Sequence, residues 1–261
     1  MPTLRDEGLV LRTRDLGEAD KVVTLLTREH GKLRAAARGS RRARSNLLPV
    51  TQPFAYGQYL VFQNRSLHNL SQGQLVRPFR RLREELVAMA YATYLAELAD
   101  AGLAEEEPHP DAFQCLLAAF DLLEKGDHQP EIVAHWYELN MLGILGYEPE
   151  LSACVTCRNP VFTADSGDRR AAIPAVMFNI EEGGCVCTSC AHSTGKARRL
   201  SPAVYKSLLY LSGATPERLA DLRLVAADMA SLSNLLTDYI EYRLEKRLHS
   251  LEFIRSLQEV K

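Results

Sequence analysis

Four cysteines form two closely spaced pairs in the second half of the chain. Two residues separate Cys154 from Cys157, and two separate Cys187 from Cys190. This spacing lets a tight turn direct both thiolates at one ion, and two such turns complete a tetrahedral site. Because four thiolates leave no position open for water, the chemistry is structural and not catalytic. The pattern therefore predicts one structural Zn²⁺ ion per chain.

Alternatives to this interpretation come from neighbouring residues. Cys185 could replace Cys187 as a ligand, and His192 could replace one of the thiolates. The excursion between the pairs is longer than the roughly 15 to 20 residues common in such sites, and a β-hairpin over residues 171–184 would shorten it. A redox role lacks the βαβ context of a thioredoxin-like motif. The sixth cysteine, Cys115, lies in an apolar helical run and is expected in the core.

A basic segment spans residues 32–44 and contains a Gly39-Ser40 pair. Strand-like alternation places its first three basic side chains on one face, and the other three follow the glycine. Guanidinium groups suit phosphate oxygens, and the segment has no Asn or Gln to read base edges. A merely solvated loop is the alternative. We expect sequence-independent contacts to nucleic acid from Lys32, Arg34, Arg38, Arg41, Arg42 and Arg44.

The charge is unevenly distributed, although its net value is only −2. Residues 1–83 hold 16 basic and six acidic side chains, whereas residues 84–150 hold one basic and 15 acidic ones. A basic segment of this density indicates a surface for phosphate backbones. Alternatively, the two segments neutralise each other across an internal interface. A smaller basic group, Lys196 with Arg198 and Arg199, either extends the nucleic-acid track or faces solvent.

Five short runs with alternating apolar residues lie between residues 7 and 75, separated by turn residues. Five strands of this length fit a small closed barrel, either an OB-fold or an SH3-like barrel. Aromatic residues near the basic segment could stack on bases. Core packing is the expectation for Tyr59 and Phe62, whereas Phe54 and Tyr56 are left open.

From residue 81 onwards the apolar residues recur at helical spacing. Three helices are expected before the cysteines and three after them, the last over residues 225–250 and packed against the first three. Ser201-Pro202 and Thr215-Pro216 are typical helix starts. No phosphate-binding loop, nucleophile elbow or zinc-protease motif occurs, so we expect no catalytic activity. The charged start and the lack of a long apolar run favour a cytoplasmic protein without a membrane segment.

Three separated motifs carry a resemblance to a known family. They are DLGEADKVVTLLTREHGKLRAAARGSRR with LLPVTQPFAYGQY, then GYEPELSACVTCRNP, then FNIEEGGCVCTSC. Together they resemble the RecO family of bacterial recombination mediators. The likeness covers most of the chain in order, while the helical middle matches in character more than in letters.

The resemblance implies an α+β fold with an amino-terminal OB-fold β-barrel and an α-helical domain that carries an inserted four-cysteine zinc module. It implies domain boundaries at 1–80, 81–150, 151–195 and 196–261. It further implies binding of single- and double-stranded DNA, strand annealing, and work with RecR to load RecA onto strands coated by single-stranded-DNA-binding protein. The zinc ligands would be the four paired cysteines, with Arg198 and Arg199 as weaker DNA contacts. A protein–protein adaptor with a basic docking barrel, or a zinc-dependent nuclease, are the other functions considered.

Overall fold

The computed structural model describes residues 2–161, 176–194 and 196–259. The chain divides into two compact units. The first unit comprises Met1–Tyr137 together with Leu248–Lys261, and the second comprises Glu138–Arg247. The second unit is therefore an insertion in the first.

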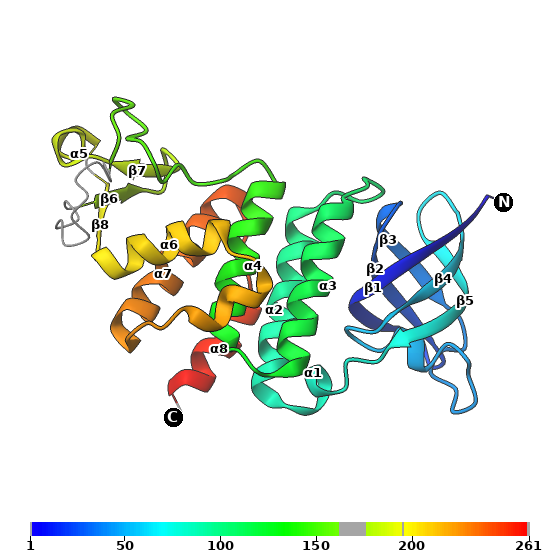
Figure 1. The fold of residues 1–261 in the computed structure, drawn as a ribbon. Helices are drawn as coiled ribbons and strands as arrows, with labels where there is room; N and C mark the ends of the chain where they lie inside the picture. Colours follow the sequence, from blue (N-terminus) through cyan, green and yellow to red (C-terminus); the bar gives the residue numbers. More distant parts are fainter. Residues whose placement is uncertain (1, 162–175, 195, 260–261) are drawn as a thin grey trace. The chain divides into compact units, whose positions relative to one another are not determined.

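The first unit begins with a closed five-stranded barrel (Figure 1). The strand order is β1-β2-β3-β5-β4, and β1 closes the barrel by pairing with β4. The β3–β5 pair is parallel, and the other pairs are antiparallel. This order is that of an OB-fold, which confirms the expected barrel and decides against the SH3-like alternative. The strands are β1 Thr3–Leu16, β2 Asp20–Thr27, β3 Gly31–Ala37, β4 Tyr56–Phe62 and β5 His68–Arg77.

The long β1 strand serves two neighbours in succession. Its first half pairs with β4 and its second half with β2, and the register shifts between Val10 and Arg12. Such a bulge bends a strand, which helps a short sheet to close. The interior is filled by alternating apolar side chains and by Tyr59, whose hydroxyl donates to the Val50 carbonyl at 2.9 Å. Tyr59 is therefore a core residue, as expected.

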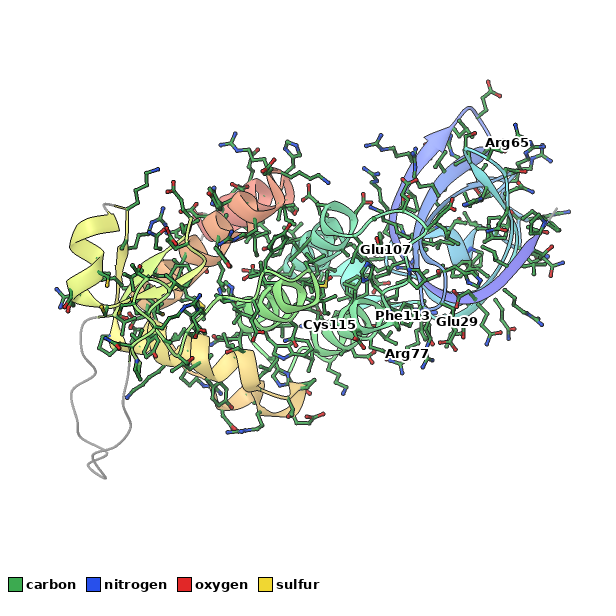
Figure 2. All side chains as sticks on the ribbon, turned by 90° about the horizontal axis from the view of Figure 1, so that it is seen from above. Glu29, Arg65, Arg77, Glu107, Phe113 and Cys115 are labelled. Atoms are coloured by element: carbon green, nitrogen blue, oxygen red, sulfur yellow. The ribbon has the colours of Figure 1, made fainter. Side chains whose placement is uncertain are left out.

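Helices cover one wall of the barrel within the same unit (Figure 1). Phe54 packs edge to face on Phe120 at 5.5 Å, and Tyr56 packs on Phe113 at 6.2 Å. Figure 2 shows Phe113 and Glu107 on the side of the helices that faces the barrel. The helices are α1 Arg81–Glu84, α2 Leu86–Gly102, α3 Pro110–Lys125, the first part of α4 Pro130–Ile144, and α8 Ser250–Glu259.

The second unit combines a small sheet with helices. The sheet has the order β7-β6-β8, and β6 is antiparallel to both neighbours. Ser201 caps α6 by accepting from the Val204 amide at 3.1 Å, as its Ser-Pro start predicts. Its elements after α4 are β6 Val176–Asn179, β7 Gly184–Val186, α5 Thr188–Thr194, β8 Arg198–Leu200, α6 Pro202–Gly213, a 3-10 helix Pro216–Asp221, and α7 Ala226–Leu244.

The prediction of one continuous helix over residues 225–250 is wrong. The chain leaves the helical conformation at Glu245, which has a φ of 51°, and α8 begins at Ser250. The carboxylate of Glu97 on α2 accepts from the backbone N–H groups of His249 and Ser250 at 3.0 and 2.8 Å. This carboxylate satisfies the free amides at the start of α8, so a side chain distant in sequence stabilises the break. It is α8 that packs back on α2.

In the described part of the chain, no helix is both long and apolar enough to cross a membrane.

Candidate metal centre and nucleic-acid face

The four predicted cysteines come together in the second unit. The sulfur atoms of Cys154, Cys157, Cys187 and Cys190 all lie within 4.8 Å of one another. The Cys157 and Cys187 sulfurs are 3.9 Å apart. A tetrahedron with zinc–sulfur bonds of about 2.3 Å has edges of about 3.8 Å. The donor set and the spacing therefore fit a four-thiolate metal site.

Two backbone turns position the ligands. In the first, the Cys154 amide donates to the Asn159 carbonyl and the Arg158 amide donates to the Cys154 carbonyl, both at 2.8 Å. Arg158 has a φ of 64°, which lets the chain turn back on itself. In the second, α5 begins directly after Cys187, and the Cys190 amide donates to the Cys187 carbonyl at 3.1 Å.

The backbone of Cys185 joins the two turns. Its carbonyl accepts from the Val155 amide at 2.9 Å, and its amide donates to the Glu150 carbonyl at 2.7 Å. Its side chain is fully buried, and burial raises the pKa of its thiol to about 12. Cys185 is not part of the four-sulfur group, whereas Cys187 is. The alternative ligand His192 has a side chain outside the described residues.

The thiols of the cluster differ in acidity. Burial raises the pKa of Cys154, but hydrogen bonds from the backbone N–H groups of Cys157, Cys187 and Thr156 outweigh it and lower that pKa to about 6. Hydrogen bonds with the thiols of Cys187 and Cys157 raise the pKa of Cys190 to about 12. One thiolate is thus formed near neutral pH, and a bound cation must displace protons from other thiols.

Helices of the second unit hold this module in place. The Tyr205 hydroxyl of α6 donates to the Leu151 carbonyl at 2.8 Å, just before the first cysteine pair. The ring of Tyr239 on α7 meets Phe178 of β6 edge to face at 5.5 Å. These contacts anchor the start and the sheet of the module, whereas the cysteine turns have few apolar side chains of their own.

A basic face lies on the outer side of β1, β2 and β3. Arg12 of β1 and Arg34 of β3 are both paired with Thr24 of β2, so they lie in one row across the sheet. Arg14 occupies the next outward position of β1, opposite Val22. All three arginines are exposed. We define the basic face as Arg12, Arg14 and Arg34; only Arg34 was singled out from the sequence, since the other two become its neighbours only through strand register.

The basic loop, residues 38–44, is fastened to the β1–β2 turn. The Gly39 amide donates to the Asp20 carboxylate at 2.7 Å, and the Arg41 amide donates to the Ala19 carbonyl at 3.0 Å. The Arg41 guanidinium also pairs with Asp15 at 3.3 Å. The remaining arginines of the loop are exposed and form no ion pair with any residue that the structure describes: Arg38, Arg42 and Arg44.

Lys32 behaves differently from the other predicted contacts. Only 8% of its side chain is exposed, and its Nζ lies 3.2 Å from a carboxylate oxygen of Asp100 on α2. The same Nζ donates to the Asp100 carbonyl. Arg12 also contacts Asp100, at 3.1 Å, and Arg34 lies 3.7 Å from Glu105. Acidic side chains of residues 84–150 therefore neutralise part of the basic charge of residues 1–83 inside the protein. This was the alternative interpretation of the charge pattern.

The second basic group lies in the other unit, on and beside β8. Arg198 pairs with Asp238 and Lys196 pairs with Glu181, each at 2.5 Å. Arg199 is exposed. Among the aromatic candidates for base stacking, Phe54 is buried and Phe62 is half-buried.

Comparison with known proteins agrees with this geometry. Residues 1–79 match the family model for the recombination protein O amino terminus, which covers the barrel, and residues 83–252 match the model for its carboxyl terminus. The chain belongs to the RecO family. A protein named DNA repair protein RecO from Symbiobacterium thermophilum is 38% identical over 98% of each chain. Proteins with the same name from Bacillus velezensis and Bacillus subtilis are 34% and 33% identical, over 98% of this chain and 95% of theirs.

Proposed function

We propose that this RecO-family chain is a non-catalytic DNA-repair mediator. It binds single- and double-stranded DNA and anneals complementary strands. With RecR, it helps to load RecA onto DNA coated by single-stranded-DNA-binding protein. The observation that carries the DNA-binding part is the alignment of Arg12 and Arg34 across the barrel beside the exposed arginines of the basic loop. The names of the relatives support the role in repair.

The chemistry of these side chains favours contacts to the DNA backbone. Guanidinium groups bind phosphate oxygens with paired hydrogen bonds and keep their charge at any physiological pH. Phosphate contacts are independent of sequence, as a mediator acting anywhere in a genome requires. About six such contacts correspond to a slope of about −4 on a single strand and about −5 on a duplex, in a plot of log affinity against log salt. We assign these contacts to Arg12, Arg14, Arg34, Arg38, Arg42 and Arg44, and leave out Lys32 because it is buried.

We further propose that the four cysteines hold Zn²⁺ with a structural role. Soft thiolates in a tetrahedral arrangement suit zinc. When bound, the ion supplies cross-links between the two turns, and no chemistry on DNA. The two cysteine turns have few apolar side chains of their own, so metal binding supplies folding energy there.

The DNA-binding proposal is tested by charge reversal in the basic loop. We expect Arg38→Glu with Arg42→Glu to weaken binding of a labelled single strand strongly at 0.1 M salt, and to reduce the salt slope by about 1.4. A matched control carries Arg223→Glu with Arg255→Glu, which changes the net charge equally at exposed sites that belong neither to the barrel strands nor to the basic loop. Equal affinities for the two variants would remove the basic loop from the DNA surface.

Annealing and loading need a separate assay. Two complementary strands with a donor and an acceptor dye, one of them coated with single-stranded-DNA-binding protein, report annealing directly. Addition of RecR and RecA then reports loading by the appearance of RecA filaments. We expect the wild type to accelerate both steps and the Arg38→Glu, Arg42→Glu variant to accelerate neither. Binding without annealing would restrict the function to DNA attachment.

A further inference from the structure

Two acidic residues of the first unit lie at the edge of the basic face. They are Asp100, near the end of α2, and Glu105, in the turn between α2 and α3. Asp100 lies 3.1 Å from Arg12, and Glu105 lies 3.7 Å from Arg34. Arg12 and Arg34 are the two arginines that share one row of the sheet. Each member of this row thus has a carboxylate beside it at a position where a phosphate would bind.

The backbone, and not the Glu105 carboxylate, holds the turn against the barrel. Residues Lys32 and Glu105 form a parallel β-bridge, and the Glu106 amide donates to the Lys32 carbonyl at 3.0 Å. The Glu106 carboxylate lies 3.1 Å from Nε2 of His68, whose side chain is 7% exposed. Gly31 meets the turn so closely that a Cβ there would lie 2.0 Å from the Glu107 carbonyl oxygen. The charge of Glu105 can therefore be removed without releasing the turn.

The pair of Arg34 and Glu105 is weak enough for DNA to replace it. Its side chains are 48% and 53% exposed, and a pair in contact with water adds little to stability. The Glu105 carboxylate still competes with DNA for Arg34, because a phosphate that binds Arg34 must first displace this carboxylate. Repulsion between Glu105 and a phosphate that stays nearby adds to this cost.

We propose that Glu105, together with Asp100, acts as an intramolecular competitor of DNA phosphate at the basic face. This inference rests on the proposed function. The two carboxylates lower the affinity at one end of the DNA track and speed release of the strand, since the loss of a local attraction raises the dissociation rate. A protein that delivers a strand to a partner gains from such release, because a strand held by every arginine would leave slowly.

The test compares two glutamates of the same turn, Glu105 and Glu107. Glu105→Gln and Glu107→Gln change the net charge equally, but the Glu107 carboxylate lies near His109 at 3.8 Å, while Glu105 faces Arg34. Both carboxylates are more than half exposed. Asp100 is left unchanged because it also holds Lys32. We expect Glu105→Gln to bind a labelled single strand about five- to tenfold more tightly at 0.1 M salt, and to steepen the salt slope by about one. For Glu107→Gln we expect less than about a twofold change.

A second pair of variants assigns the effect to Arg34. In an Arg34→Gln background, Glu105→Gln should tighten binding much less than in the original background, because the competed group is gone and only the repulsion of nearby phosphates is relieved. A gain as large as in the original background would overturn the proposal, as would equal affinities of Glu105→Gln and Glu107→Gln in the original background. If the wild type itself failed to bind DNA, the proposed function would fall and this inference with it. DNA binding with equal glutamate variants would overturn this inference alone.

Discussion

The ammonium group of Lys32 on β3 lies 3.2 Å from the Asp100 carboxylate on α2, and the lysine side chain is 8% exposed. This pair joins the barrel to α2 within the first unit. Lys32 belongs to the basic segment in sequence, but Asp100 neutralises its charge inside the protein. Its neighbour Arg34, two residues along the strand, remains half exposed.

We predict that Asp100→Ala lowers the free energy of unfolding by about 2 to 4 kcal/mol, because it leaves a buried ammonium group without its charged partner. Lys32→Met should lower the free energy of unfolding by less. The methionine side chain fills the same space, and Asp100 keeps some contact with water and with Arg12. Urea denaturation measures both. A Lys32→Met variant of unchanged stability that lost DNA binding would return Lys32 to the DNA surface.

A second prediction concerns the close approach at Gly31. Gly31 has a φ of 71°, and a Cβ there would lie 2.0 Å from a backbone oxygen of Glu107. We expect Gly31→Ala to destabilise the protein by roughly 3 kcal/mol or more, from strain and clash together. Gly17 has a similar φ of 63° but open space around it, so Gly17→Ala should show only the conformational cost of about 1 to 2 kcal/mol. Equal losses in urea denaturation would show that the contact with Glu107 is not tight.

Metal removal should affect the second unit. We predict about one equivalent of zinc in the purified protein by elemental analysis, and a lower unfolding temperature after treatment with a chelator. Cys154→Ser should lose the metal, because it removes one of four ligands. Cys185→Ala should keep it, since Cys185 is buried outside the group. If Cys185→Ala lost the metal and Cys187→Ala retained it, Cys185 would be the ligand in place of Cys187.

The Tyr205 hydroxyl gives a pH dependence of known sign. Burial, and then the charges of Cys185 and Glu150, raise the pKa of Tyr205 from 10.0 to about 12. A raised pKa means that the folded state holds the proton more tightly, so the stabilisation is complete below pH 10 and is lost as pH rises towards 12. We predict that stability falls between these pH values by up to roughly 2 kcal/mol more in the wild type than in Tyr205→Phe. Parallel stability curves for the two proteins would contradict this.

At neutral pH we expect the same Tyr205→Phe substitution to lower the free energy of unfolding by about 1 to 3 kcal/mol. The reason is the Leu151 carbonyl, which would lose the hydrogen bond that it accepts at 2.8 Å. Ser207→Ala is a suitable control, because the Ser207 hydroxyl donates only to a carbonyl of its own helix at 2.8 Å. A loss no greater than that of the control would show that the Tyr205 hydrogen bond contributes little to anchoring the module.

The sequence was informative where the chemistry is local. The spacing of Cys154 and Cys157 predicts a turn aimed at an ion, and the structure brings both pairs together. Alternation predicts the strands, because one face of each must fill the barrel. The choice between Cys185 and Cys187 was open, because it depends on where the strand ends. Cys185 lies buried inside β7, whereas Cys187 follows the strand and joins the four-sulfur group.

Other features depend on parts of the chain that meet only after folding. Arg12 becomes a neighbour of Arg34 through a register that includes a bulge, which alternation alone does not show. Lys32 is covered by Asp100, 68 residues later in the chain. The break after α7 at Glu245 interrupts an apolar pattern that stays helical in the sequence, and Glu97 of a distant helix provides the cap that stabilises it.

The insertion of Glu138–Arg247 between two parts of the first unit also determines when each unit can fold during synthesis. The inserted unit is complete once Arg247 has left the ribosome. The first unit begins earlier but still lacks α8, which supplies the last cover for α2. Because α8 ends about 180 residues after the barrel, synthesis at about 5 to 20 residues per second completes that helix roughly 10 to 40 seconds after the barrel. A chain that ends at residue 247 and has been released from the ribosome would therefore carry a complete inserted unit and an incomplete first one, with the α8 side of α2 open to chaperones.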